Sequence, residues 1–148
     1  MEDVPAGAPR LTTRWGLAWI GLGLALALHV VDEALGGFLA FYNPIAETLR
    51  ARWPLPFPPT FTFDAWLGGL AVAVVALLAL SACAFRGFRW MRPLSYALGV
   101  FMIANGLVHL TASVALGRPV AGTYSAPLLV AAAVYLMVAT PRRTATAT

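Results

Sequence analysis

The sequence predicts an all-α membrane protein, built as a bundle of four transmembrane helices. Two observations support this fold class. The first is composition: 60% of the 148 residues are hydrophobic and 11% are charged, whereas charged residues make up about a quarter of a typical soluble domain. The second is that the apolar residues gather in four runs, and a helix needs ~20 such residues to cross a ~30 Å hydrocarbon core. The length allows one domain, residues 1–148.

The four expected spans cover residues of about 15–41, 65–84, 94–114 and 124–139. We expect helices because the strands of a closed barrel would alternate between apolar and polar residues, and these runs do not. Pro93 and Pro127 stand near the expected starts of the third and fourth helices, where a missing N–H costs little. A cleaved signal peptide is not expected, since Glu2 and Asp3 make the start acidic.

The basic residues predict the orientation of the bundle. All ten are arginines, and seven of them flank one side of the expected bundle while three flank the other. The first group is Arg10, Arg14, Arg86, Arg89, Arg92, Arg142 and Arg143, and the second is Arg50, Arg52 and Arg118. Because cytoplasmic loops are enriched in arginine and lysine, both termini are expected in the cytoplasm. No organelle signal is visible, so we expect a multi-pass protein of the plasma (inner) membrane. The arginines form no basic face, which argues against a nucleic-acid partner and for a lipid bilayer.

Residues 42–64 form the only long connection. Its first part, Pro44–Trp53, can form an amphipathic helix at the membrane interface, and the following PLPFPP is expected to be extended and stiff. Two interpretations stay open for this segment: a linker that follows the membrane surface, or a lid over the outer mouth of the bundle.

Ionisable residues inside expected membrane spans are rare and indicate function by default. The first span holds His29, Asp32 and Glu33 in the string HVVDE, at spacings that place all three on one helical face. The third span holds Asn105 and His109 in NGLVH, again one turn apart. At ~1.5 Å per residue, His29 lies ~21 Å beyond Trp15, and Asn105 lies ~18 Å beyond Pro93. The two polar stripes are therefore expected at one depth, in the outer half of the membrane.

Two neighbouring carboxylates in a low dielectric need a compensating positive charge. A protonated histidine, a loop arginine (Arg50 or Arg52) or a metal ion can each supply it. For the metal, His29, Glu33 and His109 are the expected ligands of one divalent ion, zinc, iron or manganese. Bundle interiors often build metal sites from carboxylates and histidines one turn apart.

These motifs resemble those of the HXXEE family, small integral membrane proteins of unknown function. The family pattern is HXXEE, then NXXXH, then YXPG followed by threonine; the chain shows HVVDE, NGLVH and YSAP in that order. The chain departs from the pattern by having Asp32 in place of the first glutamate, and by lacking the glycine and threonine of the last motif. The resemblance implicates seven positions: His29, Asp32, Glu33, Asn105, His109, Tyr124 and Pro127.

Three functional interpretations follow. The leading one is a membrane-embedded enzyme that acts on a lipid-soluble small molecule, either with a metal ion or by acid/base chemistry alone. Its candidate catalytic residues are His29, Asp32, Glu33, Asn105, His109 and Tyr124. The second is a proton-coupled small-molecule transporter or binding protein, for which a homodimer is a natural arrangement. The third is that the polar residues only hold helices together, although three ionisable groups exceed what such contacts need.

Overall fold

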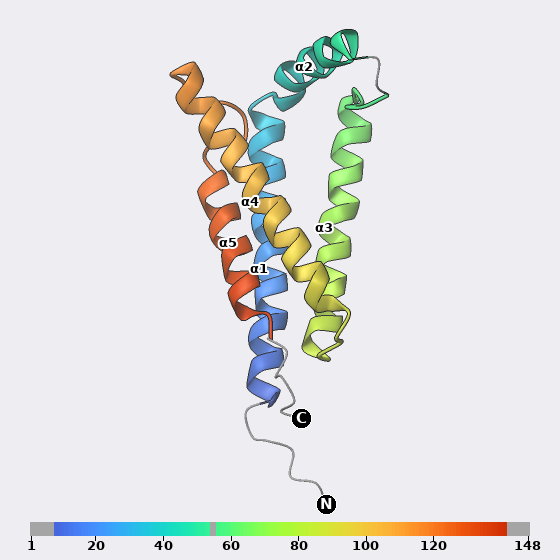
Figure 1. Ribbon diagram of the computed structural model, residues 1–148, viewed down its shortest axis with the longest axis vertical. Coiled ribbons are helices and arrows are strands. Elements are labelled where there is room, and N and C mark those ends of the chain that lie inside the picture. Colours follow the sequence, from blue (N-terminus) through green and yellow to red (C-terminus); the bar gives the residue numbers. More distant parts are fainter. Residues whose placement is uncertain (1–7, 54–55, 142–148) are drawn as a thin grey trace, which may run out of the picture.

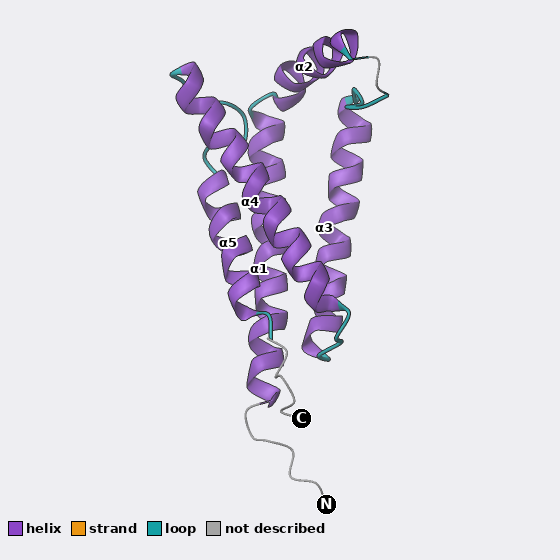
Figure 2. Ribbon diagram, viewed as in Figure 1, coloured by secondary structure: helices purple, strands orange, loops and turns teal. Residues whose placement is uncertain are grey.

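A computed structural model describes residues 8–53 and 56–141, with side chains from Leu11 onward. The described part contains five helices, and no strand lies within it (Figures 1 and 2). They are α1 (Ala8–Leu35), α2 (Phe38–Arg52), α3 (Phe63–Phe85), α4 (Met91–Leu116) and α5 (Ala126–Ala139). The all-α prediction is confirmed for these residues. Arg142 and Arg143, which entered the predicted orientation, lie outside them, as do the first two residues of PLPFPP.

Three of the described helices are long and apolar enough to cross a membrane: residues Leu11–Leu35 of α1, then α3 and α4. The fourth expected span, 124–139, appears as the shorter apolar helix α5, whose 14 residues correspond to ~21 Å of helix. Residues 121–125, just before it, form turns.

The first expected span, 15–41, is divided in the structure. Helix α1 ends at Leu35, and Gly37 adopts a left-handed conformation with φ 71° before α2 begins at Phe38. A residue without Cβ adopts this conformation at little cost, and it commonly ends helices. The chain therefore turns, and α2 lies across the end of the bundle where α1 ends and α3 begins (Figure 1).

The segment just before α3, residues 56–62, is attached to α2 by side-chain hydrogen bonds. Tyr42 donates its hydroxyl to the carbonyl of Pro59 at 3.0 Å. Asn43 bonds both backbone groups of Phe61, donating to the carbonyl at 2.9 Å and accepting from the N–H at 3.1 Å. The connection that the sequence left open as linker or lid thus contains a helix fixed over one end of the bundle, and its role as a lid stays a prediction.

Helix α1 is the centre of the bundle and packs against α3 and α5, while α4 packs mainly against α5. Its buried positions recur every three or four residues, as expected for a helix with one face in the core. Besides two glycines, the buried residues are Trp15, Ala18, Trp19, Leu22, Ala25, Leu26, His29, Val30 and Glu33. The polar residues His29 and Glu33 therefore continue the same buried stripe as the apolar ones.

A second buried polar contact ties α1 to α4 near the other end of the bundle. The indole N–H groups of Trp15 and Trp19 both donate to the hydroxyl oxygen of Ser95, at 3.0 and 3.1 Å. The Ser95 hydroxyl in turn donates to the carbonyl of Met91 at 2.9 Å. One hydroxyl has one proton and two lone pairs, so all its hydrogen-bonding capacity is used.

Candidate functional site

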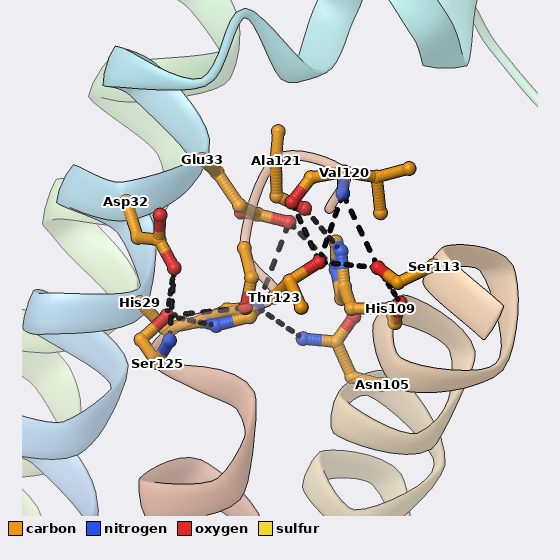
Figure 3. Close-up of polar contacts among 11 residues, drawn as sticks. His29, Asp32, Glu33, Asn105, His109, Ser113, Val120, Ala121, Thr123 and Ser125 are labelled. Atoms are coloured by element: carbon orange, nitrogen blue, oxygen red, sulfur yellow. Dashed lines mark hydrogen bonds and ion pairs between the residues drawn. The ribbon is translucent and has the colours of Figure 1, made fainter. Parts of the chain in front are cut away.

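Three parts of the chain bring polar side chains together inside the bundle (Figure 3). The last two turns of α1 carry His29, Asp32 and Glu33, and α4 carries Asn105 and His109. The third part is the loop between α4 and α5, residues 117–125. The sequence predicted that the polar residues of α1 and α4 lie at one depth, and in the structure they are in direct contact.

The centre of the site consists of His29, Glu33 and His109. Glu33 Oε1 lies 3.0 Å from His109 Nε2 and 3.6 Å from His29 Nε2. The two imidazole rings meet edge to face, with centroids 4.8 Å apart. The exposed fractions of the three residues are 0% for His29 and 5% for both Glu33 and His109. Water therefore has little access to these charges, and each must be satisfied inside the protein.

The far nitrogen of His109 fixes the tautomer of that ring. Nδ1 lies 2.6 Å from the carbonyl oxygen of Ala121. A carbonyl only accepts, so Nδ1 carries a proton and donates it. In the neutral ring, Nε2 is then unprotonated, and its lone pair is directed at Glu33.

A serine and a carboxylate fix His29 in the same way. Asp32 Oδ2 accepts from the backbone N–H of Ser125 at 2.9 Å and from its hydroxyl at 2.8 Å. The hydroxyl also lies 3.2 Å from the carbonyl of Gly122, but the closer, charged acceptor is the stronger one. With its only proton given to Asp32, Ser125 must accept from His29 Nδ1, 2.8 Å away. His29 Nε2 is thus also unprotonated, and Asn105 Nδ2 donates a hydrogen bond to it at 3.2 Å.

The loop between α4 and α5 approaches both rings closely. At Gly122 (φ 82°), an added Cβ would lie 2.8 Å from His109 Nδ1 and 2.9 Å from His29 Cε1. The loop is held by Thr123, whose hydroxyl oxygen accepts from the Val120 N–H at 3.0 Å and lies 2.5 Å from Ser113 Oγ. A glycine is strongly favoured here, because a Cβ would strain the backbone conformation and displace the histidine rings.

The six predicted catalytic residues do not all meet. The structure brings together His29, Asp32, Glu33, Asn105 and His109. Within this group, Asp32 is connected to His29 through the Ser125 hydroxyl. Tyr124 is 78% exposed, and the adjacent residue, Ser125, makes the contact with the site. The sequence prediction named Tyr124 from this part of the chain, and it missed Ala121 and Gly122, which act through backbone atoms.

Two cavities reach the site. The larger, about 490 Å³, is bounded by α1, α3 and α4, with Phe38 of α2 and Trp66 of α3 at the polar end, and His29, Glu33 and Asn105 line it. The smaller, about 300 Å³, lies between α2, α4 and the 117–125 loop, and His109 and Asn105 line it. Asn105 and Phe38 line both cavities, so the centre of the site borders space on two sides.

The donor set suits a metal ion. His29, Glu33 and His109 each offer one ligand atom, and these atoms lie within 4.8 Å of one another. Tetrahedral zinc with bonds of ~2.0–2.1 Å requires ligand atoms about 3.3–3.4 Å apart. The two distances to Glu33 Oε1, 3.0 and 3.6 Å, bracket that value, while the full set spans up to 4.8 Å, so its atoms must draw closer around an ion. Hydrogen bonds that fix Nδ1 of each ring are the usual outer support of metal-binding histidines. In the structure the same residues form an ion pair.

Fold and site together define a helical protein with long apolar helices and a buried His–Glu–His centre. The family comparison agrees with the motifs: the chain belongs to the HXXEE family, described as proteins of unknown function with an HXXEE motif, whose model matches residues 19–136. The resemblance predicted from HVVDE, NGLVH and YSAP is confirmed. No match was found among the curated proteins or the solved structures.

Proposed function

We propose that the chain is a multi-pass membrane protein in which α1, α3, α4 and α5 each cross the bilayer, with both termini in the cytoplasm. The start of α1 and the end of α5 lie at one end of the bundle (Figure 1). That same end is flanked by Arg14 of α1, by Arg86 and Arg89 in the α3–α4 connection, and by Arg92 in the first turn of α4, as the positive-inside rule requires.

The short fourth helix is compatible with this topology. The loop before α5 reaches inward to the buried histidines, so part of the fourth crossing is irregular backbone. Irregular backbone at membrane depth is tolerated where protein covers it. Here the Ala121 carbonyl accepts from His109, and the Ser125 N–H donates to Asp32.

The function that we propose is a metal-dependent, membrane-embedded enzyme acting on an apolar small molecule. One observation carries the proposal: two imidazole nitrogens and a carboxylate oxygen lie together, with His29 and Glu33 lining the polar end of an apolar cavity and His109 lining the adjoining one. His29, Glu33 and His109 would hold one divalent ion, zinc, iron or manganese. Such an ion supplies Lewis-acid polarisation of a substrate oxygen or activation of a water molecule.

The remaining polar residues have supporting roles in this proposal. Asp32 orients His29 through Ser125, since its Oδ2 bonds Ser125 and not the ion-binding atoms. The Ala121 carbonyl orients His109. Asn105 lines both cavities and is placed to donate a hydrogen bond to a substrate oxygen.

A metal-free acid/base site is the second candidate, and the 3.0 Å contact between Glu33 and His109 favours it. Without a metal ion, one proton must lie between these two groups, because Nδ1 of His109 is already protonated. A proton held in this way can be exchanged with a bound substrate. It would equally serve a proton-coupled transporter working as a homodimer, or a purely structural contact between α1 and α4.

Elemental analysis by mass spectrometry separates these candidates. Detergent-purified protein is loaded with zinc, iron or manganese in turn, passed over a desalting column and analysed. We expect about one equivalent of one metal in the wild type, and its loss in Glu33→Gln, which keeps the shape of the side chain. Tyr124→Phe, at an exposed neighbour of the site, is the matched control and should keep the metal. Equal metal content in wild type and Glu33→Gln, or none in any sample, would refute the metal-dependent proposal.

A further inference from the structure

The larger cavity is polar at one end only. His29, Glu33 and Asn105 supply its polar atoms, and they lie together below α2. The remaining wall is apolar along its length. From α3 it includes Leu70, Ala73, Ala76, Leu77 and Leu80, and from α4 it includes Leu94, Leu98, Phe101 and Met102. An occupant must therefore combine a small polar head with a long apolar body.

The length of the apolar wall fits one hydrocarbon chain. Along α4, Asn105 and Leu94 are eleven residues apart, which corresponds to about 16 Å of helix. Half of a ~30 Å hydrocarbon core is ~15 Å, the depth that a lipid chain spans in one leaflet. The volume, about 490 Å³, lies within the ~300–1,000 Å³ range of ligand sites.

The wall also reaches the outer surface of the bundle. Helix α3 packs on α1 and α4 packs on α5, so the cavity lies where α3 and α4 diverge. Ala76 and Phe101 belong to its lining and are both exposed. A lipid can enter sideways from the bilayer, with its chain parallel to α3 and α4.

We propose that this cavity binds a single-chain lipid with an oxygen-bearing head, such as a fatty acid, a fatty alcohol or a simple acyl ester. The chain lies along α3 and α4, and the head oxygen meets Asn105 and the His29–Glu33–His109 centre. The inference rests on the proposed function for the chemistry at the head, because a bound cation attracts oxygen ligands. The apolar wall selects the chain independently of any metal ion.

Photolabelling in lipid nanodiscs tests the proposal. The probe is a sixteen-carbon fatty acid that carries a diazirine near the chain end and a terminal alkyne. Crosslinks are expected at the deep end of the cavity, on Leu80 and Leu94. Unlabelled fatty acids and alcohols of graded length should compete, whereas excess two-chain phospholipid should not. Crosslinks spread over the lipid-facing surface, or competition by phospholipid alone, would overturn the single-chain assignment.

A substitution within the wall tests chain length. Ala76→Phe fills the cavity about 15 Å of helix beyond Trp66, and Ala71→Phe places the same ring on α3 at an exposed position outside the cavity lining. Each buried methylene contributes about fourfold in affinity, so excluding two of them weakens competition by sixteen-carbon chains about 15-fold. Ten-carbon competitors should be unaffected. Leu98→Trp, on α4, provides a second variant if Ala76→Phe fails to fold.

The outcomes separate this inference from the proposed function. If the protein binds one metal ion but Ala76→Phe and Ala71→Phe have the same chain-length profile, the lipid inference is wrong while the metal proposal stands. If no metal binds but Ala76→Phe shortens the preferred chain, the lipid site stands and the metal proposal is wrong. Glu33→Gln should lose the metal and keep the chain-length profile.

Discussion

Replacing Gly122 by alanine is the sharpest perturbation of the site that changes none of its side chains. The new Cβ would lie 2.8 Å from His109 Nδ1 and 2.9 Å from His29 Cε1, closer than carbon atoms approach such atoms in real structures. Both rings, or the loop itself, must move. Either movement changes the hydrogen bonds that hold Nδ1 of each ring, and with them the direction of both Nε2 lone pairs.

The expected magnitude follows from two contributions. A residue with Cβ in a left-handed conformation costs ~1–2 kcal/mol, which lowers the free energy of unfolding. Loss of the outer support of metal-bound histidines costs ~10–100-fold in metal affinity, equivalent to about 1.4–2.8 kcal/mol. We therefore expect Gly122→Ala to fold, with reduced stability, and to bind zinc ~10–100-fold more weakly than the wild type.

Gly117→Ala is the matched control for backbone strain. Gly117 also has a positive φ, 63°, but nothing lies within 4 Å of an added Cβ. Both variants should lose stability in a denaturant titration, Gly122→Ala the more because its Cβ also clashes with the two rings, while only Gly122→Ala should lose affinity when zinc is titrated against a competing chromophoric chelator. Equal zinc affinities in the two variants would refute the argument that the loop positions the histidines.

Three further predictions concern the support of the site and the packing of the bundle. Ser125→Ala should keep one metal equivalent but bind it ~10–100-fold more weakly, and Asp32→Asn should weaken metal binding too. Unchanged affinity in both variants, measured by chelator competition, would contradict the argument that Asp32 orients His29 through Ser125. Ser95→Ala removes the acceptor of two indole N–H groups and should lower the free energy of unfolding by about 1.2 kcal/mol, since such bonds contribute ~0.6 kcal/mol each in membranes; metal content should not change. Gly106→Ala places a Cβ 2.6 Å from a valine methyl of α5 and should destabilise the bundle by ~1–3 kcal/mol. Gly21→Ala, in open space, should instead stabilise α1 by ~0.5–1 kcal/mol. Equal thermal stability of these two variants would show that α4 and α5 are not closely packed.

The helices and the centre of the site were predictable from the sequence because both depend on local patterns. Long apolar runs predicted the helices, and the spacing of His29 with Glu33 predicted a shared helical face. Counting ~1.5 Å per residue along two helices predicted that Asn105 and His109 lie at the level of His29. The contact between Glu33 and His109, at 3.0 Å, agrees with that arithmetic.

The rest depends on features that a pattern of residue types does not contain. The apolar run 15–41 did not decide that α1 ends at Leu35 and that α2 crosses the end of the bundle. Periodicity fixes which residues share a face and leaves open how each helix is rotated against its neighbours. Ser125 rather than Tyr124 therefore reaches the site. The Ala121 carbonyl leaves no signal in the sequence at all, because every residue has one.

X-ray absorption spectroscopy on zinc-loaded protein tests directly whether His29, Glu33 and His109 bind one ion, since it counts the ligands of the ion itself. We predict nitrogen and oxygen ligands at ~2.0–2.1 Å, with the scattering of two imidazole rings in the wild type and of one ring in His109→Ala. A spectrum with no imidazole contribution, or one that is identical in the two proteins, would show that the ion does not bind between His29, Glu33 and His109.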